Sequence, residues 1–222
     1  MIAIDGPVAA GKTAVGRRLA QRLALKYVDT GVMYRAITWL ALQRATPMYD
    51  EQALGMLADE HPIRLKDQGS REVLVGEHRV GPELWESSVD AQVSLVARVS
   101  AVRRALVHQQ RLLASHGDIV MAGRDIGTVV LPNADLKVFL LASPESRAER
   151  RWHELQAQGQ TVEFQQVLRE TKARDEIDSQ RDDSPLVPAP DALMVDTGYR
   201  SITQVLDLIL EGIVGSDRAF GP

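Results

Sequence analysis

The amino-acid sequence predicts an α/β protein in which a parallel sheet carries helices on both faces. Short apolar runs alternate along the chain with longer segments whose apolar residues recur at helical spacing, and this alternation is typical of a parallel sheet. A glycine-rich stretch, residues 6–13, lies between the first apolar run and the first helical segment. The alternation breaks over residues 61–89, where we expect a small β-rich insertion.

The glycine-rich stretch reads GPVAAGKT and fits the P-loop pattern G-x-x-x-x-G-K-[ST]. Its context fits as well, because residues 2–4 predict a strand before it and residues 14–25 predict a helix after it. Gly6 and Gly11 can adopt backbone angles that turn N–H groups toward phosphate oxygens, and the start of the helix adds the positive end of its dipole. A glycine-rich turn with a chance lysine is the weaker alternative.

We therefore expect this stretch to bind the phosphates of a nucleoside triphosphate. Lys12 can reach the outer phosphates, and the hydroxyl of Thr13 can ligate Mg²⁺. The expected binding residues are Gly6, Pro7, Val8, Ala9, Ala10, Gly11, Lys12, Thr13 and Ala14.

The elements that follow the first helix continue the alternation. Residues 26–28 form a short apolar strand that ends at Asp29, and Thr30 is the expected cap of a helix over residues 32–44. A shorter helix follows at residues 50–60. Within the insertion, residues of alternating polarity predict exposed antiparallel strands. These expected strands are residues 63–65, 72–75 and 78–80.

Helices resume near Val89, and the second half of the chain returns to single strands separated by helices. Residues 123–132 are an expected loop, and residues 184–190 cannot be helical because they contain three prolines. The expected strands are residues 118–121, 136–141 and 192–195, and the expected helices are residues 101–116, 144–158, 162–180 and 202–213.

The composition limits the classes of function. A chain of 222 residues is long enough for one core and a small inserted unit. The formal net charge of −4 gives no overall attraction to nucleic acid or to an anionic membrane. The sequence has no cysteine, which excludes disulfides and thiolate chemistry, and no signal peptide or membrane span is visible. We expect a cytoplasmic protein that binds neither nucleic acid nor membranes.

The P-loop alone does not identify the reaction, because GTPases, ATPases, helicases and small kinases share it. The base-reading signature N-K-x-D of G proteins is absent, as is the run of four apolar residues and an acidic pair that marks an ATPase strand. Several arginines follow the ends of expected strands, where a parallel sheet presents its ligands. This pattern favours a small kinase, because arginine neutralises and aligns phosphates.

Four further stretches carry a closer resemblance. They are DTGVMYR at residues 29–35, GRDIGTVV at 123–130, RAERR at 147–151 and RDEIDSQR at 174–181. In this order and spacing, over nearly the whole chain, they resemble the bacterial cytidylate kinases. The resemblance implies an enzyme that transfers the γ-phosphoryl group of ATP to CMP or dCMP.

The resemblance also implies a domain organisation. The fold would be a five-stranded parallel sheet of the P-loop NTPase type. Residues 61–89 would form an NMP-binding insertion and residues of about 144–182 a helical lid, while residues 1–60 and 90–222 would form the core kinase domain.

The arginines receive their roles from the same resemblance. It places Arg35, Arg124 and Arg181 on the phosphate of CMP. It makes Arg147, Arg150 and Arg151 lid arginines that close over the ATP phosphates. The catalytic candidates are therefore Lys12, Arg124, Arg147, Arg151 and Arg181.

The sugar and the base need different partners. Arg174, Asp178 and Arg181 are spaced i, i+4, i+7, as on one helix face, and a surface ladder of ion pairs is the alternative. The resemblance suggests that Asp178 and Arg174 hold the sugar hydroxyls. A carboxylate suits the N4 amino group of cytosine, and an arginine suits its acceptors. The positions that match the family's pyrimidine site are Thr30, Ser94, Arg103 and Asp125, with Ser94 near the sugar.

Several alternatives stay open. Asp5 and Asp29, which we expect to end adjacent strands, either orient Mg²⁺-bound water or only cap the segments that follow. The acceptor can be UMP, in a related nucleoside monophosphate kinase. From a different class, the chain can be a nucleotide switch that hydrolyses slowly. We expect a monomer with ATP and Mg²⁺ as cofactors.

Overall fold

The computed structural model describes residues 1–65, 72–157 and 159–215 of the chain. Parts of three expected units lie outside the described residues. They are residues 66–71 of the insertion, residue 158 of the lid and residues 216–222 of the core domain.

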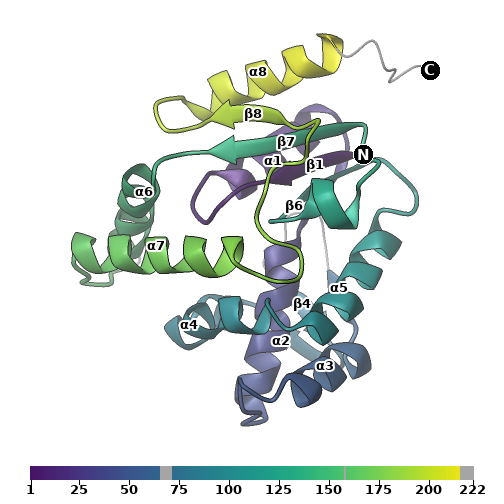
Figure 1. The fold of residues 1–222 in the computed structure, drawn as a ribbon, viewed down its shortest axis with the longest axis vertical. Coiled ribbons are helices and arrows are strands. Elements are labelled where there is room, and N and C mark those ends of the chain that lie inside the picture. The colour runs from purple at the N-terminus through teal and green to yellow at the C-terminus, as the bar shows by residue number, and fades with distance from the viewer. Residues whose placement is uncertain (66–71, 158, 216–222) are drawn as a thin grey trace.

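The centre of the fold is a five-stranded sheet in the order β2-β6-β1-β7-β8, and every neighbouring pair is parallel (Figure 1). The central strand β1 is buried along its whole length. All five strands lie within two residues of their predicted positions. They are β1 (Ile2–Asp5), β2 (Lys26–Asp29), β6 (Ile119–Ala122), β7 (Leu136–Leu141) and β8 (Leu193–Asp196).

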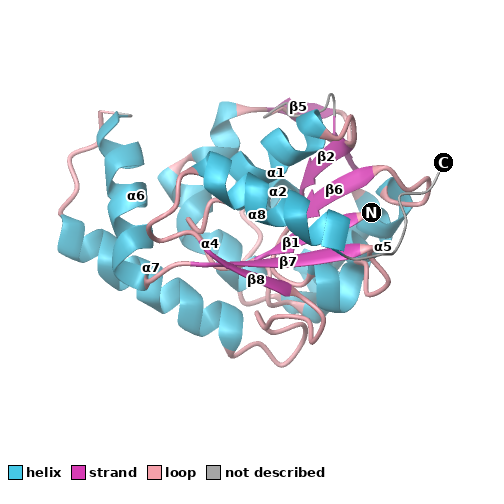
Figure 2. Cartoon of the chain, turned by 90° about the horizontal axis from the view of Figure 1, so that it is seen from above, coloured by secondary structure: helices cyan, strands magenta, loops and turns pink. Residues whose placement is uncertain are grey.

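Helices connect the strands and cover the sheet (Figures 1 and 2). None of the helices within the described ranges is long and apolar enough to span a bilayer. The longer helices are α1 (Lys12–Arg22), α2 (Thr30–Gln43), α3 (Glu51–Glu60), α4 (Ser87–Val96), α5 (Ser100–Leu113), α6 (Pro144–Ala157), α7 (Phe164–Ser179) and α8 (Ile202–Gly215). A 3-10 helix at Pro82–Trp85 and a π-helical turn at Ile126–Val130 complete the helical segments.

The two faces of the sheet carry different layers. Ile2 and Ile4 of β1 pack with α1 and α8, in a core that also holds Leu19 and Ile209. Ala3 faces the other way, into a core with α5 and the π-helical turn. Because successive strand residues point to opposite faces, the short apolar strand β1 serves both layers. The predicted α/β fold with helices on both faces is confirmed.

The predicted insertion forms a separate antiparallel sheet. Its strands β3 (Ile63–Leu65), β4 (Val73–Val75) and β5 (His78–Val80) pair in that order. They share a hydrophobic core with α2, α3, α4 and α5, which together form the lower part of Figure 1. Helices α3 and α5 approach closely at Gly55, where an added Cβ would lie 2.5 Å from the side chain of Ala101.

Three local predictions are wrong. Asp29, not Thr30, caps α2, because the Oδ1 of Asp29 accepts the N–H of Gly31 at 3.1 Å and the helix already begins at Thr30. Residues 123–132, expected as a loop, contain the π-helical turn. Asp5 and Asp29 do not end adjacent strands, because β6 lies between β1 and β2.

Candidate active site

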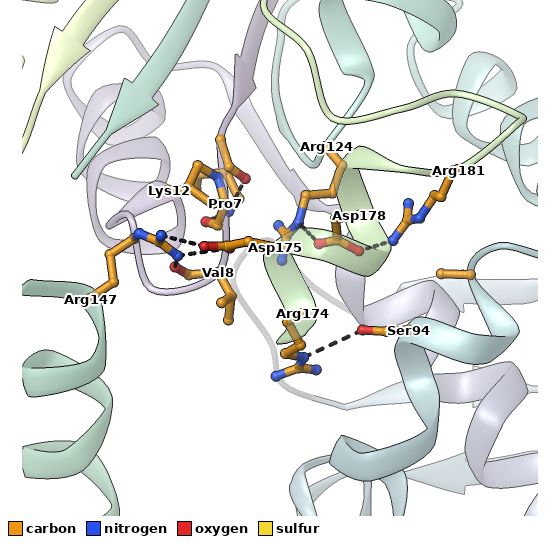
Figure 3. Close-up of polar contacts among 12 residues, drawn as sticks. Pro7, Val8, Lys12, Ser94, Arg124, Arg147, Arg174, Asp175, Asp178 and Arg181 are labelled. Atoms are coloured by element: carbon orange, nitrogen blue, oxygen red, sulfur yellow. Dashed lines mark hydrogen bonds and ion pairs between the residues drawn. The ribbon is translucent and has the colours of Figure 1, made fainter. Parts of the chain in front are cut away.

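The glycine-rich loop between β1 and α1 has the backbone that its sequence predicts. Gly6 and Gly11 have φ angles of 149° and 94°, in the region that favours glycine. A Cβ on Gly6 would lie 2.5 Å from the carbonyl oxygen of Leu140. The Nζ of Lys12 donates to the carbonyls of Gly6 at 2.8 Å and Pro7 at 2.7 Å, so this side chain lies across the loop (Figure 3). Burial lowers the pKa of Lys12 well below its ordinary value.

Thr13 and Asp29 meet beside this loop. The Oγ1 of Thr13, in the first turn of α1, donates to the Oδ2 of Asp29 at 2.7 Å. Asp29 therefore caps α2 with one oxygen and contacts Thr13 with the other. A hydroxyl and a carboxylate are oxygen ligands of the kind that Mg²⁺ prefers, so the residues present fit the expected magnesium site.

Asp5 ends β1 and anchors the π-helical turn. Its Oδ1 and Oδ2 accept the N–H groups of Ile126 at 2.8 Å and Gly127 at 2.7 Å. Arg111 holds the far end of the turn by donating to its last two carbonyls, at 2.7 and 3.1 Å. Burial raises the pKa of Asp5 to about 6. These contacts are the ones that the capping alternative expects.

A pocket lies at the carboxyl edge of the sheet, with walls from α2, α4, α5, α7 and the segment after β6. It brings together every residue that we expect to bind the substrate. These nine lining residues are Thr30, Arg35, Ser94, Arg103, Arg124, Asp125, Arg174, Asp178 and Arg181. The other catalytic candidates, Lys12, Arg147 and Arg151, are not among the residues that line it.

Arg103 and Asp125 form a buried ion pair in the wall of the pocket. Their exposed fractions are 2% and 4%. The guanidinium of Arg103 also lies 5.6 Å from the ring centroid of Tyr34, and it donates to the carbonyl of Ala97 at 3.2 Å. Its Nε is buried without a hydrogen-bond partner among the described residues. The two charges of the pair thus compensate each other, and the Nε of Arg103 keeps a donor that no described residue accepts.

Asp178 joins two arginines of the pocket. The Nε of Arg124 donates to its Oδ2 at 2.8 Å, and Arg181 pairs with its Oδ1 (Figure 3). Burial by itself would raise the pKa of Asp178, but Arg124 and Arg181 outweigh it and hold the pKa below its ordinary value.

The spacing argument for these residues is only partly right. Arg181 lies beyond the end of α7, so it does not share a helix face with Arg174 and Asp178. The alternative of a surface ladder is also wrong, because Asp178 is only 3% exposed.

Asp90, in the first turn of α4, contacts three arginines. Its carboxylate lies 2.5 Å from Arg35, 3.2 Å from Arg174 and 3.4 Å from Arg151. The Nε of Arg174 also reaches the Oγ of Ser94 at 3.4 Å (Figure 3). Asp90 is not itself a lining residue of the pocket. Its carboxylate contacts two lining residues of the pocket, Arg35 and Arg174.

Arg147 and Arg150 of α6 point toward the glycine-rich loop. Arg147, which is 2% exposed, pairs with both oxygens of Asp175 at 2.9 and 2.5 Å. It also donates to the carbonyl of Val8 at 3.3 Å (Figure 3). Arg150 donates to the Oγ1 of Thr197 at 3.1 Å, which joins α6 to the segment after β8.

Sequence reasoning missed three residues of this network, Tyr34, Asp90 and Asp175. Tyr34 and Asp175 lie inside the stretches that carry the family resemblance, so their positions next to Arg35 and Arg174 were a usable signal. Asp90 gave none, because its three arginines are 55, 61 and 84 residues away in the sequence.

Comparison with known proteins identifies a family. The family model described as cytidylate kinase matches residues 2–214. The cytidylate kinase of Listeria monocytogenes is 46% identical over 209 residues, which cover 94% of this chain and 93% of that protein. The bifunctional pantoate ligase/cytidylate kinase of Synechococcus sp. is 48% identical over 215 residues, or 95% of this chain. This chain spans 40% of the length of that bifunctional relative.

A solved structure gives a likeness of fold alone. An uncharacterized protein from Eubacterium ventriosum superposes with a TM-score of 0.53 and 14% identity, covering 96% of this chain and 97% of that one. Identity this low carries no functional argument. The family model and the sequence relatives, in contrast, cover nearly all of the chain. The chain therefore belongs to the cytidylate kinase family, a family of nucleoside monophosphate kinases.

Proposed function

We propose that the chain transfers the γ-phosphoryl group of ATP to CMP or dCMP. An oxygen of the CMP phosphate forms a bond to the γ-phosphorus, and the bond between that phosphorus and the β,γ-bridging oxygen breaks. The products are ADP and CDP or dCDP. Phosphoryl transfer of this kind depends on charge neutralisation and alignment rather than on covalent chemistry with the protein.

One observation carries the proposal: the pocket beside the glycine-rich loop is lined by an excess of arginines. Five arginines and three aspartates line the pocket, so positive charge exceeds negative charge by two. This excess complements the dianionic phosphate of a nucleoside monophosphate. Arg124, one of the five, is close enough to Lys12 to lower its pKa, after the larger effect of burial. A nucleotide switch that only hydrolyses ATP or GTP would not need this second site.

At the donor end, the loop N–H groups would hold the ATP phosphates, and Lys12 would neutralise the charge that develops on the migrating group. Thr13 would ligate Mg²⁺, and Asp29 would orient the water around it. When bound with ATP, Mg²⁺ supplies further neutralisation of the β- and γ-phosphates.

At the acceptor end, Arg35, Arg124 and Arg181 would bind the phosphate of CMP. Asp178, with Arg174, would accept hydrogen bonds from the sugar hydroxyls. The contact between Arg174 and Ser94 supports a place for Ser94 near the sugar.

Base choice would depend on Asp125 and Arg103. Asp125 would accept hydrogen bonds from N4 of cytosine, and the buried Nε of Arg103, which lacks a partner among the described residues, would donate to a base acceptor. Thr30 lines the same pocket and donates to the carbonyl of Ala122 at 2.9 Å. The O4 acceptor of UMP would oppose the carboxylate of Asp125, which disfavours UMP.

Residues 144–182 would act as the lid, with Arg147 and Arg151 over the ATP phosphates, and residues 61–89 would belong to the NMP-binding part. A lid that excludes water prevents wasteful hydrolysis. Hydrogen exchange with CMP alone, with an unreactive ATP analogue alone and with both measures the closure. We expect the strongest protection of residues 144–182 with both ligands, and equal protection with CMP alone would contradict the assignment.

The decisive experiment for the function is an acceptor panel. The enzyme is incubated with ATP and Mg²⁺ and, in separate reactions, with CMP, dCMP, UMP, AMP, GMP or no acceptor, and the products are separated. We expect CDP and dCDP as the main products and little ADP without an acceptor. Preferential formation of UDP would favour the uridylate alternative, and acceptor-independent loss of ATP or GTP would favour the switch.

A further inference from the structure

We propose that Asp90 is a positioning residue that couples the lid helix α6 to the acceptor pocket. Its single carboxylate contacts two arginines of the pocket, Arg35 and Arg174, and one arginine of the lid, Arg151. The inference rests on the proposed function for the identity of the acceptor. The contacts themselves do not depend on that identity.

Asp90 lies on α4, against which α2 and α7 pack. Helix α7 packs against both α6 and α4 (Figure 1), and Arg35 comes from α2. Apart from Asp90, Arg35 contacts the carbonyl of Leu84 at 3.1 Å. Arg151 otherwise pairs at 3.4 Å with Glu154, whose side chain is 60% exposed. Within the described ranges, Asp90 is the one carboxylate that contacts all three arginines.

The charges around Asp90 favour one carboxylate that is shared by three arginines. Burial alone would raise the pKa of Asp90, but Arg174, Arg35 and Arg151 outweigh it and keep the carboxyl ionised. One negative charge among three guanidinium groups fixes their directions without cancelling their charge. The arginines of the pocket therefore keep attraction for an incoming phosphate.

Coupling follows from competition for the same donors. A phosphate dianion in the pocket would draw N–H groups of Arg35 and Arg174 away from Asp90. The carboxylate would then be more available to Arg151, which strengthens the contact between α4 and α6. Acceptor binding thereby favours the position of α6 over the donor phosphates. Because such coupling is reciprocal, an ordered α6 would also favour acceptor binding.

The first test measures hydrogen exchange of α6 in wild type, Asp90→Asn and the matched control Glu86→Gln. Glu86 precedes Asp90 by one helical turn and is exposed, so its variant removes the same charge without touching the three arginines. We expect faster exchange of α6 in Asp90→Asn than in Glu86→Gln, even without nucleotide. CMP should increase the protection of α6 in wild type and Glu86→Gln but not in Asp90→Asn. Equal exchange in the two variants would overturn the proposal.

The second test separates positioning from general destabilisation. In Asp90→Asn we expect KM for CMP to rise about tenfold, with partial recovery in Asp90→Glu. The dissociation constant of ATP measured without CMP should change less than threefold. A fall in thermal stability with unchanged KM for CMP would contradict a positioning role.

A double-mutant cycle tests the link to the lid. Arg151→Gln should add little to the effect of Asp90→Asn on KM for CMP, because both remove the same contact. Arg147→Gln, whose partner is Asp175, should add its full effect. If the effects of Arg151→Gln and Asp90→Asn on KM for CMP are fully additive, the proposed coupling is wrong. If wild type phosphorylates no CMP, the proposed function is wrong, but α6 exchange without nucleotide still decides whether Asp90 holds the lid.

Discussion

The two ends of the site are built by different means. The proposed donor end is a continuous stretch in which the glycine backbone, one lysine and one threonine would bind and neutralise the phosphates of ATP. The acceptor pocket is a set of charged side chains from α2, α4, α5, α7 and the segment after β6. At the donor end, the local backbone conformation positions the N–H groups of the loop. In the acceptor pocket, Arg35, Arg103, Arg124 and Arg174 each pair with a carboxylate from a distant part of the chain, such as Asp178 for Arg124, whereas Arg181 pairs with Asp178 three residues away.

This difference has a practical consequence for variants. A change at the donor end should act directly on the reaction, because few other residues depend on a loop side chain. A change in the pocket should also affect neighbouring residues, because removing one carboxylate leaves a buried arginine without its partner. An unpaired buried charge lowers the stability of the folded state. The following predictions test that contrast.

Lys12→Ala should have the largest effect on the reaction, about 10³-fold in kcat, or about 4 kcal/mol. Stability should change little, because the side chain contacts only two loop carbonyls. Steady-state kinetics beside a thermal melt measure both. The exposed Lys26→Ala serves as the control for loss of one positive charge. A folded Lys12→Ala variant with activity within a few-fold of wild type would refute a direct role.

Asp5 precedes the glycine-rich loop and binds the turn beside the pocket. From its raised pKa we expect stability to depend on pH. In the folded protein its pKa is about 6, compared with an ordinary value of 3.8. The folded state therefore binds an extra proton between these values, and the contribution of Asp5 to stability falls as pH rises through this window. Above pH 6 the loss should be on the order of 3 kcal/mol.

Chemical denaturation of wild type and Asp5→Asn from pH 4 to 7.5 measures this effect. We expect the free energy of unfolding of wild type, relative to the variant, to decline between pH 4 and 6 and then to level. Asp59→Asn, at an exposed site, is the control. A difference that is constant or increases with pH would show that the pKa of Asp5 is not raised.

Asp125→Asn should change base choice by about 10²-fold. The amide has one acceptor oxygen instead of two and no negative charge to attract N4 of cytosine, but its NH2 group can donate to O4 of uracil. The ratio of kcat/KM for CMP to that for UMP should therefore fall, and Asp182→Asn, at an exposed site nearby in sequence, should leave it unchanged. If Asp125 serves only to hold Arg103, both substrates will lose activity by the same factor.

Gly11→Ala should have the smallest effect and isolates the backbone contribution at the donor end. Gly11 and Gly159 have φ angles of 94° and 78°, and an added Cβ at either meets nothing within 4 Å. Each alanine variant should lose about 1–2 kcal/mol of stability through backbone strain alone. Only Gly11→Ala should also raise KM for ATP. An equal KM in both variants would mean that the loop tolerates a changed backbone.

The contrast between the two ends also explains what the sequence could predict. Every strand of both sheets, and the glycine-rich loop, follows from local pattern, because a strand or a P-loop needs only contiguous residues. The error at Thr30 is of a different kind. Either Asp29 or Thr30 can cap a helix, and the choice depends on which residue keeps an extended backbone, which here is Asp29.

Local sequence patterns alone could not predict the residues of the pocket. Family resemblance supplied its nine residues, but not the pairing of Arg103 with Asp125 or the role of Asp90, because these contacts join residues that no spacing relates. The π-helical turn escaped notice for the same reason. It forms where Asp5 and Arg111 hold its two ends, and both lie outside its own sequence.

The π-helical turn connects the two loops that would hold the two nucleotides under the proposed function. Asp5 directly precedes the donor loop, and the turn that it grips directly follows Arg124 and Asp125. The two loops are thus joined by two hydrogen bonds of 2.8 and 2.7 Å rather than by a hinge. The two loops cannot separate at this point without breaking these two hydrogen bonds. Under the proposed function, this pairing sets the spacing between the two phosphate-binding sites before either nucleotide binds.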